Sequence, residues 1–388
     1  MKEYSTVELL GKLVSHDTTS WKSNLELIDF LVAYLTRYDI QPKVIYNSDR
    51  TKANLLATIG PEGRPGIILS GHTDVVPVLE QNWSHDPFDM LARGGRLHGR
   101  GTSDMKGFIA CVLSAVPKFV RAELAEPLHL AFSYDEETGC TGGKSLVEHV
   151  RGMTVKPRAC IVGEPTEMKV VNSHKGIFHL LTRVQGLEAH SSTDRGLNAV
   201  MYAADMISFL NDLAEEMRQR TPLVDGFDPP YTTIHVGRIK GGTAANITPS
   251  YCEFEWDIRP LPGGDQEEVL ARFNSYVDGH TLPSMRERSK EHARVETNIL
   301  SHVPSLLPET GSSAETLVLA LAGQNDVSVV SYGTEAGIFQ ATGGVPTVVC
   351  GPGSILQAHK PDEYIDLGQL ASCDDFLDRL LAMIKKTE

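Results

Sequence analysis

The feature that most constrains the fold of this chain is an alternation of short apolar runs with amphipathic stretches. Apolar runs at Ile67–Leu69, Leu128–Ser133 and Ala159–Val162 alternate with helical patterns at about 106–121 and after Gly142. Strands that alternate with helices predict an α/β fold, with a central, mostly parallel sheet flanked by helices. Functional residues are then expected at the carboxyl ends of the strands.

Residues 1–40 read as two amphipathic helices. Ser5 and Glu8, and again Ser23 and Glu26, have the spacing of a capping box, in which a serine and a glutamate satisfy the first amides of a helix. Two β-rich runs at 42–47 and 54–60 follow them.

The alternation is interrupted between residues 174 and 300. This segment has the order β-α-β-β-α-β of a ferredoxin-like α+β domain. Its expected elements lie at 176–186, 196–220, 232–242, 250–260, 265–277 and 293–300. After residue 300 the α/β pattern resumes. We therefore expect residues 1–173 and 301–388 to form one catalytic domain and residues 174–300 to form an inserted domain.

Composition excludes several classes of function. A chain of 388 residues favours two domains, and a net charge of −14 disfavours nucleic acid or an anionic membrane as a partner. No window reaches the roughly 18 apolar residues of a membrane span, and the N-terminus lacks the pattern of a signal peptide. The six cysteines form no CxxC pair, so buried, reduced thiols in a cytoplasmic protein are expected.

Three consecutive acids follow the apolar run at 128–133, in "SYDEETG". Asp135, Glu136 and Glu137 repel one another, and burial would cost each of them its hydration. Either a positive group lies nearby, or the segment is a solvated turn.

Four further polar residues follow strand-like runs or lie in glycine-rich loops. His72 and Asp74 in "LSGHTD" point to one face of an extended chain, where a carboxylate can fix the tautomer of a metal-bound imidazole; a hydrogen-bonded turn is the alternative. Asp104 in "GRGTSDMKGF" precedes a helix and is equally typical of an N-cap. Glu164 in "IVGEPTE" follows the run at 159–162.

His359 in "GPGSILQAHKPDEY" adds a second imidazole to this set. Two imidazoles and three carboxylates suit two zinc-class ions that share one carboxylate. Such a pair of ions is typical of hydrolases.

The motifs "SGHTDVVPV", "GRGTSDMKG", "DEETG", "GEPT" and "AHKPDEY" resemble, over essentially the whole chain, the di-zinc amidohydrolases and peptidases that include acetylornithine deacetylase and succinyl-diaminopimelate desuccinylase. The resemblance implies a zinc-peptidase-like catalytic domain with two divalent metal ions, zinc or alternatively cobalt. It also implies a cis peptide bond after the bridging aspartate. The implied metal ligands are His72, Asp104 (bridging), Glu137, Glu164 and His359, with Glu136 as general base and Asp74 orienting His72. Asp135 receives no role beyond capping the turn.

The resemblance also assigns roles in the inserted domain, which it implies to be a dimerisation or lid domain. His190 in "VQGLEAHSST" would reach the active site of the other subunit of a homodimer and stabilise the oxyanion, although alone it reads as a structural histidine. Arg259 is the expected partner of a substrate carboxylate. The further implied substrate-binding residues are Asn246, Gly333, Thr334, Lys175 (a solvated lysine is the alternative) and Glu335 (a partner for a substrate ammonium group).

Within this family, "SYDEETGCTG" and "SYGTEAGIF" resemble the acetylornithine deacetylase branch most closely. This implies hydrolysis of N2-acetyl-L-ornithine to L-ornithine and acetate, a step of arginine biosynthesis. The alternatives are a succinyl-diaminopimelate desuccinylase, an aminoacylase or a dipeptidase. A catalytically silent binding protein is disfavoured because no ligand or base is missing. Phosphoester hydrolysis and nucleotide binding are disfavoured because no basic cluster or P-loop is present.

Overall fold

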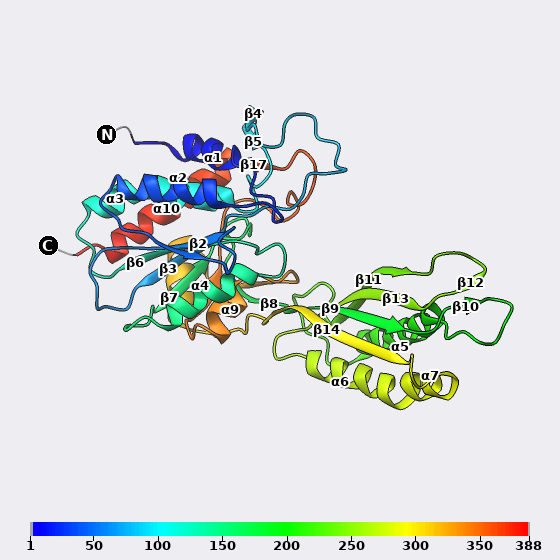
Figure 1. Cartoon of the computed structure of the whole chain (residues 1–388). Coiled ribbons are helices and arrows are strands. Elements are labelled where there is room, and N and C mark those ends of the chain that lie inside the picture. The colour runs from blue at the N-terminus through cyan, green and yellow to red at the C-terminus, as the bar shows by residue number, and fades with distance from the viewer. Residues whose placement is uncertain (1–2, 387–388) are drawn as a thin grey trace. The chain divides into compact units, whose positions relative to one another are not determined.

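A computed structural model of the chain describes residues 3–386 (Figure 1). Two compact units are present, and each is described by itself. The first comprises the described residues up to Ser173, Leu306–Val329, and those from Thr334 onward. The second comprises His174–Ser305 and Val330–Gly333.

The first unit is built around an eight-stranded mixed sheet with the order β1-β2-β6-β3-β7-β16-β8-β15. The strands β6, β3, β7 and β16 at its centre are parallel, whereas β1, β2 and β8 pair antiparallel with their neighbours. The bounds are β1 Lys43–Tyr46, β2 Ala53–Ile59, β3 Ile67–His72, β6 Leu128–Ser133, β7 Ala159–Val162, β8 Val171–His174, β15 Ser328–Val330 and β16 Thr347–Val349. Every residue of β3, β6 and β7 is buried, because helices cover both faces of the sheet.

Helices cover the two faces unequally (Figure 1). The main apolar core packs five helices against one face, whereas α4 and α9 contact strands of the sheet outside that core. The five are α1 Thr6–Val14, α2 Leu25–Thr36, α3 Lys106–Arg121, α8 Ser313–Ala322 and α10 Leu367–Ile384; the others are α4 Thr141–Arg151 and α9 Ala336–Ala341. The α/β plan expected from the alternation is therefore confirmed.

A small three-stranded sheet, β17-β5-β4, joins distant parts of the first unit. Its strands are β4 Leu91–Arg93, β5 Arg96–His98 and β17 Tyr364–Asp366. Since β5 leads into the loop of Asp104 and β17 follows the loop of His359, their antiparallel pairing brings these two loops together.

The second unit has the ferredoxin-like order expected from the sequence. Its antiparallel sheet runs β11-β13-β9-β14, and an apolar core joins it to two helices, α5 and α6. The bounds are β9 Ile177–Gln185, α5 Ala199–Gln219, β11 Thr233–Gly241, β13 Tyr251–Arg259, α6 Gln266–Tyr276 and β14 Arg294–Val303. A π-helical turn, Val277–Thr281, and α7, Leu282–Arg288, extend α6, and a two-stranded ribbon pairs β10, Ala189–His190, with β12, Ile247–Thr248.

One of the two expected capping boxes is wrong. Ser5 and Glu8 form the box at the start of α1. At α2, however, the N-cap residue is Asn24, whose side chain does not cap the helix, and the Ser23 hydroxyl accepts the N–H of Leu25 at 3.2 Å and not that of Glu26. The Ser23 hydroxyl instead donates to the carbonyl of Thr51 at 2.6 Å, and the Asn24 amide donates to that of Ala53 at 2.8 Å. These distant carbonyls cannot be read from local spacing.

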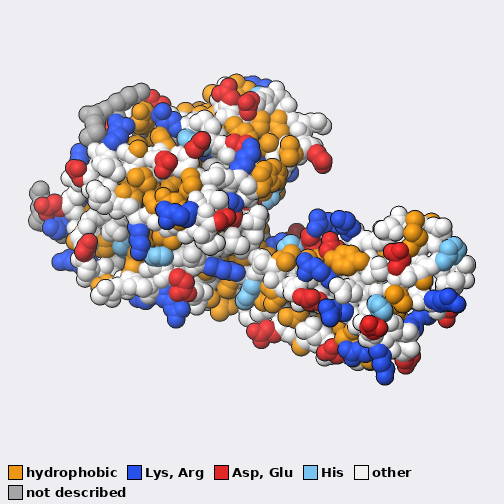
Figure 2. Space-filling model, viewed as in Figure 1, with side chains coloured by type: hydrophobic (Ala, Val, Ile, Leu, Met, Phe, Trp, Pro, Cys, Tyr) orange, Lys and Arg blue, Asp and Glu red, His pale blue; other side chains and the backbone are white. Residues whose placement is uncertain are grey.

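The remaining expectations concern the cysteines, the charged surface and a membrane span. All six cysteines are buried and free, as expected. On the face seen in Figure 2, acidic side chains are interspersed with lysines and arginines. Within the described part of the chain, no helix combines the length and the apolar character needed to cross a membrane.

Candidate metal centre

Three neighbouring parallel strands end at the same edge of the large sheet. His72 is the last residue of β3, the acidic turn 135–137 follows β6, and Glu164 follows β7. The register places His72 opposite Ser133, so β3 and β6 end level, and it places Val162, the end of β7, opposite Ser70, two residues before the end of β3. Their side chains therefore converge at one edge, as expected for a parallel sheet.

Asp104 lies between the two imidazoles. Its Oδ1 is 3.0 Å from His72 Nε2, and its Oδ2 is 3.3 Å from His359 Nε2. The alternative role as an N-cap is excluded, because α3 begins after Met105 without any side-chain cap. The peptide bond between Asp104 and Met105 is cis, as the resemblance implied.

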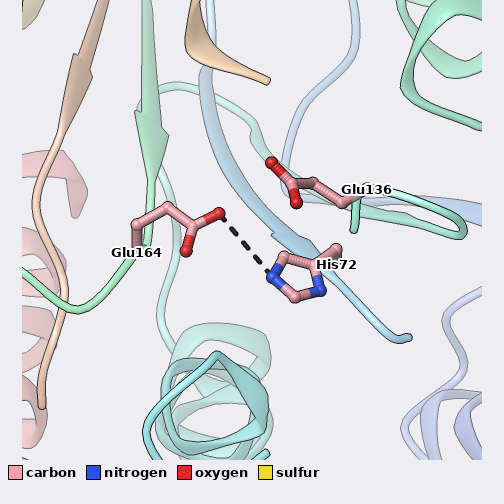
Figure 3. Close-up of side chains that lie close together, drawn as sticks. All are labelled: His72, Glu136 and Glu164. Atoms are coloured by element: carbon pink, nitrogen blue, oxygen red, sulfur yellow. Dashed lines mark ion pairs between the residues drawn. The ribbon is translucent and has the colours of Figure 1, made fainter. Parts of the chain in front are cut away.

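The other two candidate ligands pair with one imidazole each. Glu164 Oε1 lies 3.7 Å from His72 Nε2, and Glu137 Oε2 lies 3.1 Å from His359 Nε2. Figure 3 shows the Glu136 carboxylate facing the space between His72 and Glu164. Two groups of possible metal ligands are present, His72–Glu136–Glu164 and His72–Asp104–Glu137. Within each group, the donor atoms lie within 4.8 Å of one another. The structure thus brings together all five expected ligands and Glu136.

Asp74 contacts His72 through both its backbone and its side chain. His72 Nδ1 lies 3.0 Å from the backbone carbonyl oxygen of Asp74 but 3.6 Å from its carboxylate. The carbonyl therefore accepts the Nδ1 proton and leaves Nε2 free to face Asp104. The carboxylate instead accepts the backbone N–H groups of Glu136 at 3.0 Å and Glu137 at 3.3 Å.

Burial and like charge dominate the electrostatics of this edge. Burial raises the pKa of Glu136 and Glu164 well above the usual range, and burial together with Asp104 raises the pKa of Glu137 to about 7. Hydrogen bonds to Asp104 and Glu137 raise the pKa of His359 to about 10.

These shifts describe a buried surplus of carboxylates facing two imidazoles. Isolated charges of this kind are costly unless cations compensate them, and carboxylate oxygens and imidazole nitrogens are donors that zinc-class ions accept. The residues present therefore fit a pair of divalent ions.

Glu363 is a residue of this site that sequence reasoning missed. Its buried carboxylate accepts the backbone N–H groups of Gly101, Ser103 and Asp104 at 3.0, 2.8 and 3.1 Å, and it pairs with Arg100 at 2.7 Å. It therefore holds the loop that presents Asp104. The only signal was its place in "AHKPDEY", close to His359.

The expected residues of the second unit are held mainly by their own neighbours. His190 is exposed on β10, with Nδ1 2.8 Å from the Ser192 hydroxyl. Asn246 is also exposed. It lies beside His190, because its backbone carbonyl accepts the N–H of Ser191 at 3.0 Å. Arg259, at the end of β13, pairs with Asp257 at 3.1 Å.

Lys175 and Gly333 lie together in the second unit. Lys175 is 1% exposed, and its Nζ donates to the carbonyls of Pro229 and Tyr231 at 2.8 and 2.7 Å. The alternative of a solvated lysine is therefore wrong. A Cβ atom at Gly333 would come within 3.1 Å of the Lys175 carbonyl and 2.7 Å of the Ile177 side chain, so any other residue would displace Ile177.

Thr334 and Glu335 lie in the first unit, just before α9. The Thr334 hydroxyl accepts the N–H of Ala336 at 3.1 Å. Glu335 is buried against α4, where a side chain at Gly143 would come within 2.5 Å of its Oε1. Burial raises the pKa of Glu335 to about 7.

With this geometry in place, comparison with known proteins decides the family. Residues 68–383 match the sequence profile of "Peptidase family M20/M25/M40". The acetylornithine deacetylase of Pasteurella multocida (strain Pm70) is 34% identical over 385 residues, which cover 98% of this chain and 97% of that protein. The chain belongs to peptidase family M20/M25/M40.

Solved structures of M20 proteins share the fold. The M20 metallo-carboxypeptidase Sso-CP2 of Sulfolobus solfataricus superposes with a TM-score of 0.76 at 17% identity, covering 98% of this chain and 99% of that one. The YXEP protein of Bacillus subtilis, a dinuclear metal-binding M20 peptidase, superposes with a TM-score of 0.61 at 15% identity, covering 99% and 98%. Family membership and the ligand groups at the strand ends together support metal-dependent hydrolysis of an amide bond.

Proposed function

We propose that this M20 hydrolase removes the acyl group from a small N-acyl amino acid, with N2-acetyl-L-ornithine as the expected substrate. The products would be L-ornithine and acetate, and arginine biosynthesis in the cytoplasm is the proposed setting of the reaction. The observation that carries the proposal is the Asp104 carboxylate between His72 and His359, with Glu136 close to His72 and Glu164. The 34% identity to an acetylornithine deacetylase supports the choice of substrate.

Two zinc ions are the expected metals, with cobalt as the alternative. Asp104 would contribute to both ions, His72 and Glu164 to one, and Glu137 and His359 to the other. When bound, the two ions supply Lewis acidity that polarises the amide carbonyl and makes a water molecule easier to deprotonate.

Glu136 is the proposed general base. Its carboxylate would take the proton of the attacking water and deliver it to the nitrogen of the leaving amine, which restores the carboxylate for the next cycle. The buried environment that raises its pKa favours a carboxyl group able to hold that proton between the two transfers. The thiol of Cys140 donates to Glu136 Oε1 at 3.4 Å and helps to orient it.

Substrate recognition is proposed for residues of both units. The guanidinium of Arg259 suits the α-carboxylate of an amino acid, because its two parallel N–H groups match two carboxylate oxygens. His190, as a donor in trans within a homodimer formed through the second unit, would stabilise the oxyanion of the tetrahedral intermediate. Asn246, Lys175, Gly333, Thr334 and Glu335 complete the proposed substrate-binding set.

The deciding experiment measures kcat/KM for the protein loaded with defined amounts of zinc or cobalt. The panel comprises N2-acetyl-L-ornithine, other N-acetyl amino acids, succinyl-diaminopimelate and dipeptides. The proposal predicts the highest kcat/KM for N2-acetyl-L-ornithine. A clear preference for succinyl-diaminopimelate or for dipeptides would contradict the proposed substrate while leaving amide hydrolysis intact. No turnover of any compound by the metal-loaded protein would contradict the enzymatic function itself.

A further inference from the structure

The turn that carries Glu136 and Glu137 is held by a lysine that lies just before β2. Lys52, directly before β2, donates from Nζ to the Asp135 carboxylate and to the backbone carbonyl of Ser20. The side chains of Lys52 and Asp135 are only 13% and 17% exposed, so water screens the pair weakly. This is the positive group that three consecutive acids require.

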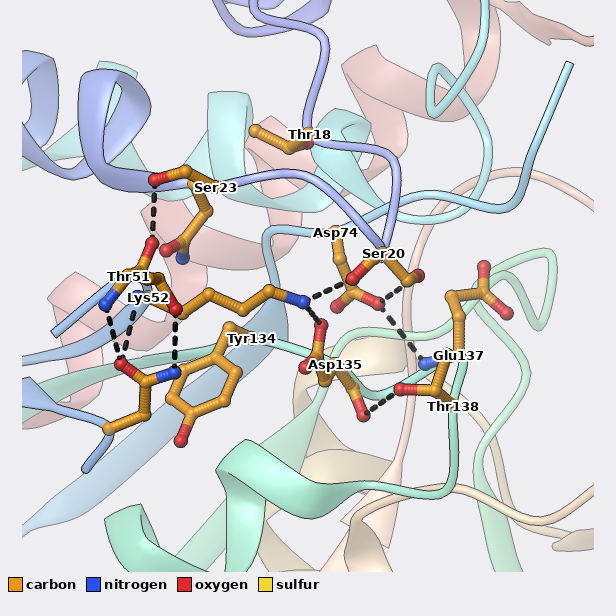
Figure 4. A network of polar contacts seen from close by, with 12 residues as sticks. Thr18, Ser20, Ser23, Thr51, Lys52, Asp74, Tyr134, Asp135, Glu137 and Thr138 are labelled. Atoms are coloured by element: carbon orange, nitrogen blue, oxygen red, sulfur yellow. Dashed lines mark hydrogen bonds and ion pairs between the residues drawn. The ribbon is translucent and has the colours of Figure 1, made fainter. Parts of the chain in front are cut away.

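A second set of contacts joins the same turn to Ser20. The Ser20 hydroxyl donates to Asp74 Oδ2 at 2.8 Å, and the Asp74 carboxylate accepts the N–H groups of Glu136 and Glu137. Figure 4 shows Lys52 reaching Ser20 and Asp135, and Ser20 reaching Asp74. Lys52, Ser20, Asp74 and the turn therefore form a closed ring of contacts around the backbone of the two glutamates.

The backbone of the turn needs such a restraint. Asp135 has a φ of 54°, in the left-handed region that residues other than glycine rarely adopt. Lys52 is itself held in place, because Asn47 Oδ1 accepts the N–H groups of Thr51 and Lys52, each at 2.9 Å. A well-held residue before β2 thus fixes an unusual backbone conformation in the turn after β6.

We propose that Lys52, acting directly on the Asp135 carboxylate and through Ser20 on Asp74, is a positioning residue for the turn that presents Glu136 and Glu137. It touches neither glutamate side chain and sets where their backbone lies. The expected effect of Lys52 on kcat rests on the proposed function of Glu136. The expected effect of Lys52 on the backbone conformation of the turn does not.

The first test measures backbone protection without any turnover. In Lys52→Met, the amides of Glu136 and Glu137 should exchange with deuterium faster than in the wild-type protein, as measured by mass spectrometry on peptides spanning 134–139 in metal-free protein. Arg158→Met is the matched control, because it breaks another half-buried ion pair of the first unit, with Glu126 at 2.6 Å. Equal exchange of these peptides in the wild type, Lys52→Met and Arg158→Met would overturn the proposal.

The second test separates positioning from general stability. With a substrate that the wild type hydrolyses, Lys52→Met should lower kcat by about 10- to 100-fold with little change in KM, since small displacements of catalytic groups have effects of this size. Lys52→Arg should restore most of kcat. Asp135→Asn should resemble Lys52→Met, and the double variant should lose no more than either, because the pair acts as one unit.

A kcat loss that Lys52→Arg fails to restore, or that adds fully to the loss in Asp135→Asn, would overturn the positioning role. If the wild type hydrolysed no amide at all, the proposed function would fail, and the exchange experiment would still decide the role of Lys52. Zinc titration of metal-free Lys52→Met adds a further readout, because a displaced Glu137 should weaken zinc binding relative to Arg158→Met.

Discussion

His72, Asp104 and Glu164 of the first unit are held differently from His190 and Arg259 of the second. In the first unit, His72, Asp104 and Glu164 are almost completely buried and contact one another. In the second, His190 is exposed and Arg259 is half-buried, and each contacts a neighbour on its own segment. Buried carboxylates repel one another, so their convergence in the first unit is favourable only when cations compensate their charge. His190 and Arg259, which are proposed to meet the substrate, are by contrast exposed and half-buried.

This contrast predicts that metal removal affects the two units very differently. Dialysis against a chelator should abolish hydrolysis and destabilise the first unit, since ions at about 100 times Kd contribute about 2.7 kcal/mol to folding. Hydrogen exchange with and without zinc should then change in 68–74, 134–139 and 160–166 far more than in β9 and β13. Equal changes in hydrogen exchange in both units would contradict the prediction that metal removal acts mainly on the first unit.

Glu136→Gln tests the chemistry of the first unit without its metal binding. Loss of a general base should lower kcat by about 10²- to 10⁴-fold, while metal content per chain stays at the wild-type value. Glu148→Gln, an exposed acid on α4 beside Arg151, is the control and should leave kcat unchanged. Wild-type turnover by Glu136→Gln would assign the base to another residue.

His190→Ala tests whether an exposed residue of the second unit contributes to the reaction. If its imidazole stabilises the oxyanion, kcat should fall by about 10²- to 10³-fold. Thermal unfolding should not change, because the side chain is exposed. Mixing His190→Ala with Glu136→Gln then tests action in trans: recovered activity requires His190 of one chain to serve Glu136 of the other. Mixed chains that exchange subunits but stay inactive would restrict His190 to its own chain.

Arg259→Met should have the smallest effect of the four changes. Loss of a charged hydrogen-bond partner costs about 1.5–3 kcal/mol, which corresponds to a rise in KM of about 10- to 100-fold with metal content unchanged. Arg238→Met, which breaks an exposed contact with Glu255 on the same sheet, is the control and should leave KM unchanged. An unchanged KM in Arg259→Met would exclude Arg259 as the carboxylate partner.

Much of the first unit could be predicted from the sequence, because the patterns that indicate its strands and site residues are local. Apolar runs of strand length predicted β3, β6 and β7, and polar residues at their ends indicated one edge of a parallel sheet. The contacts that support this edge could not be predicted from the sequence. Lys52 and Glu363 act on residues that are distant in the chain, so no spacing rule reveals them.

The second unit shows the same limit. Its strand and helix order followed from periodicity, whereas the burial of Lys175 depends on carbonyls of Pro229 and Tyr231 that lie far along the chain. A lysine in a polar segment reads as solvated until its partners are known.

For this protein, the sequence alone determined the element order of both units and the residue types at the strand ends, since apolar periodicity and short motifs are properties of neighbouring residues. Only the tertiary structure decided how the three acids of 135–137 differ. Asp135 pairs with Lys52, Glu136 faces His72 and Glu164, and Glu137 contacts His359. The physical reason is that a carboxylate's role depends on the charges and donors that surround it, and here those come from four separate segments of the chain.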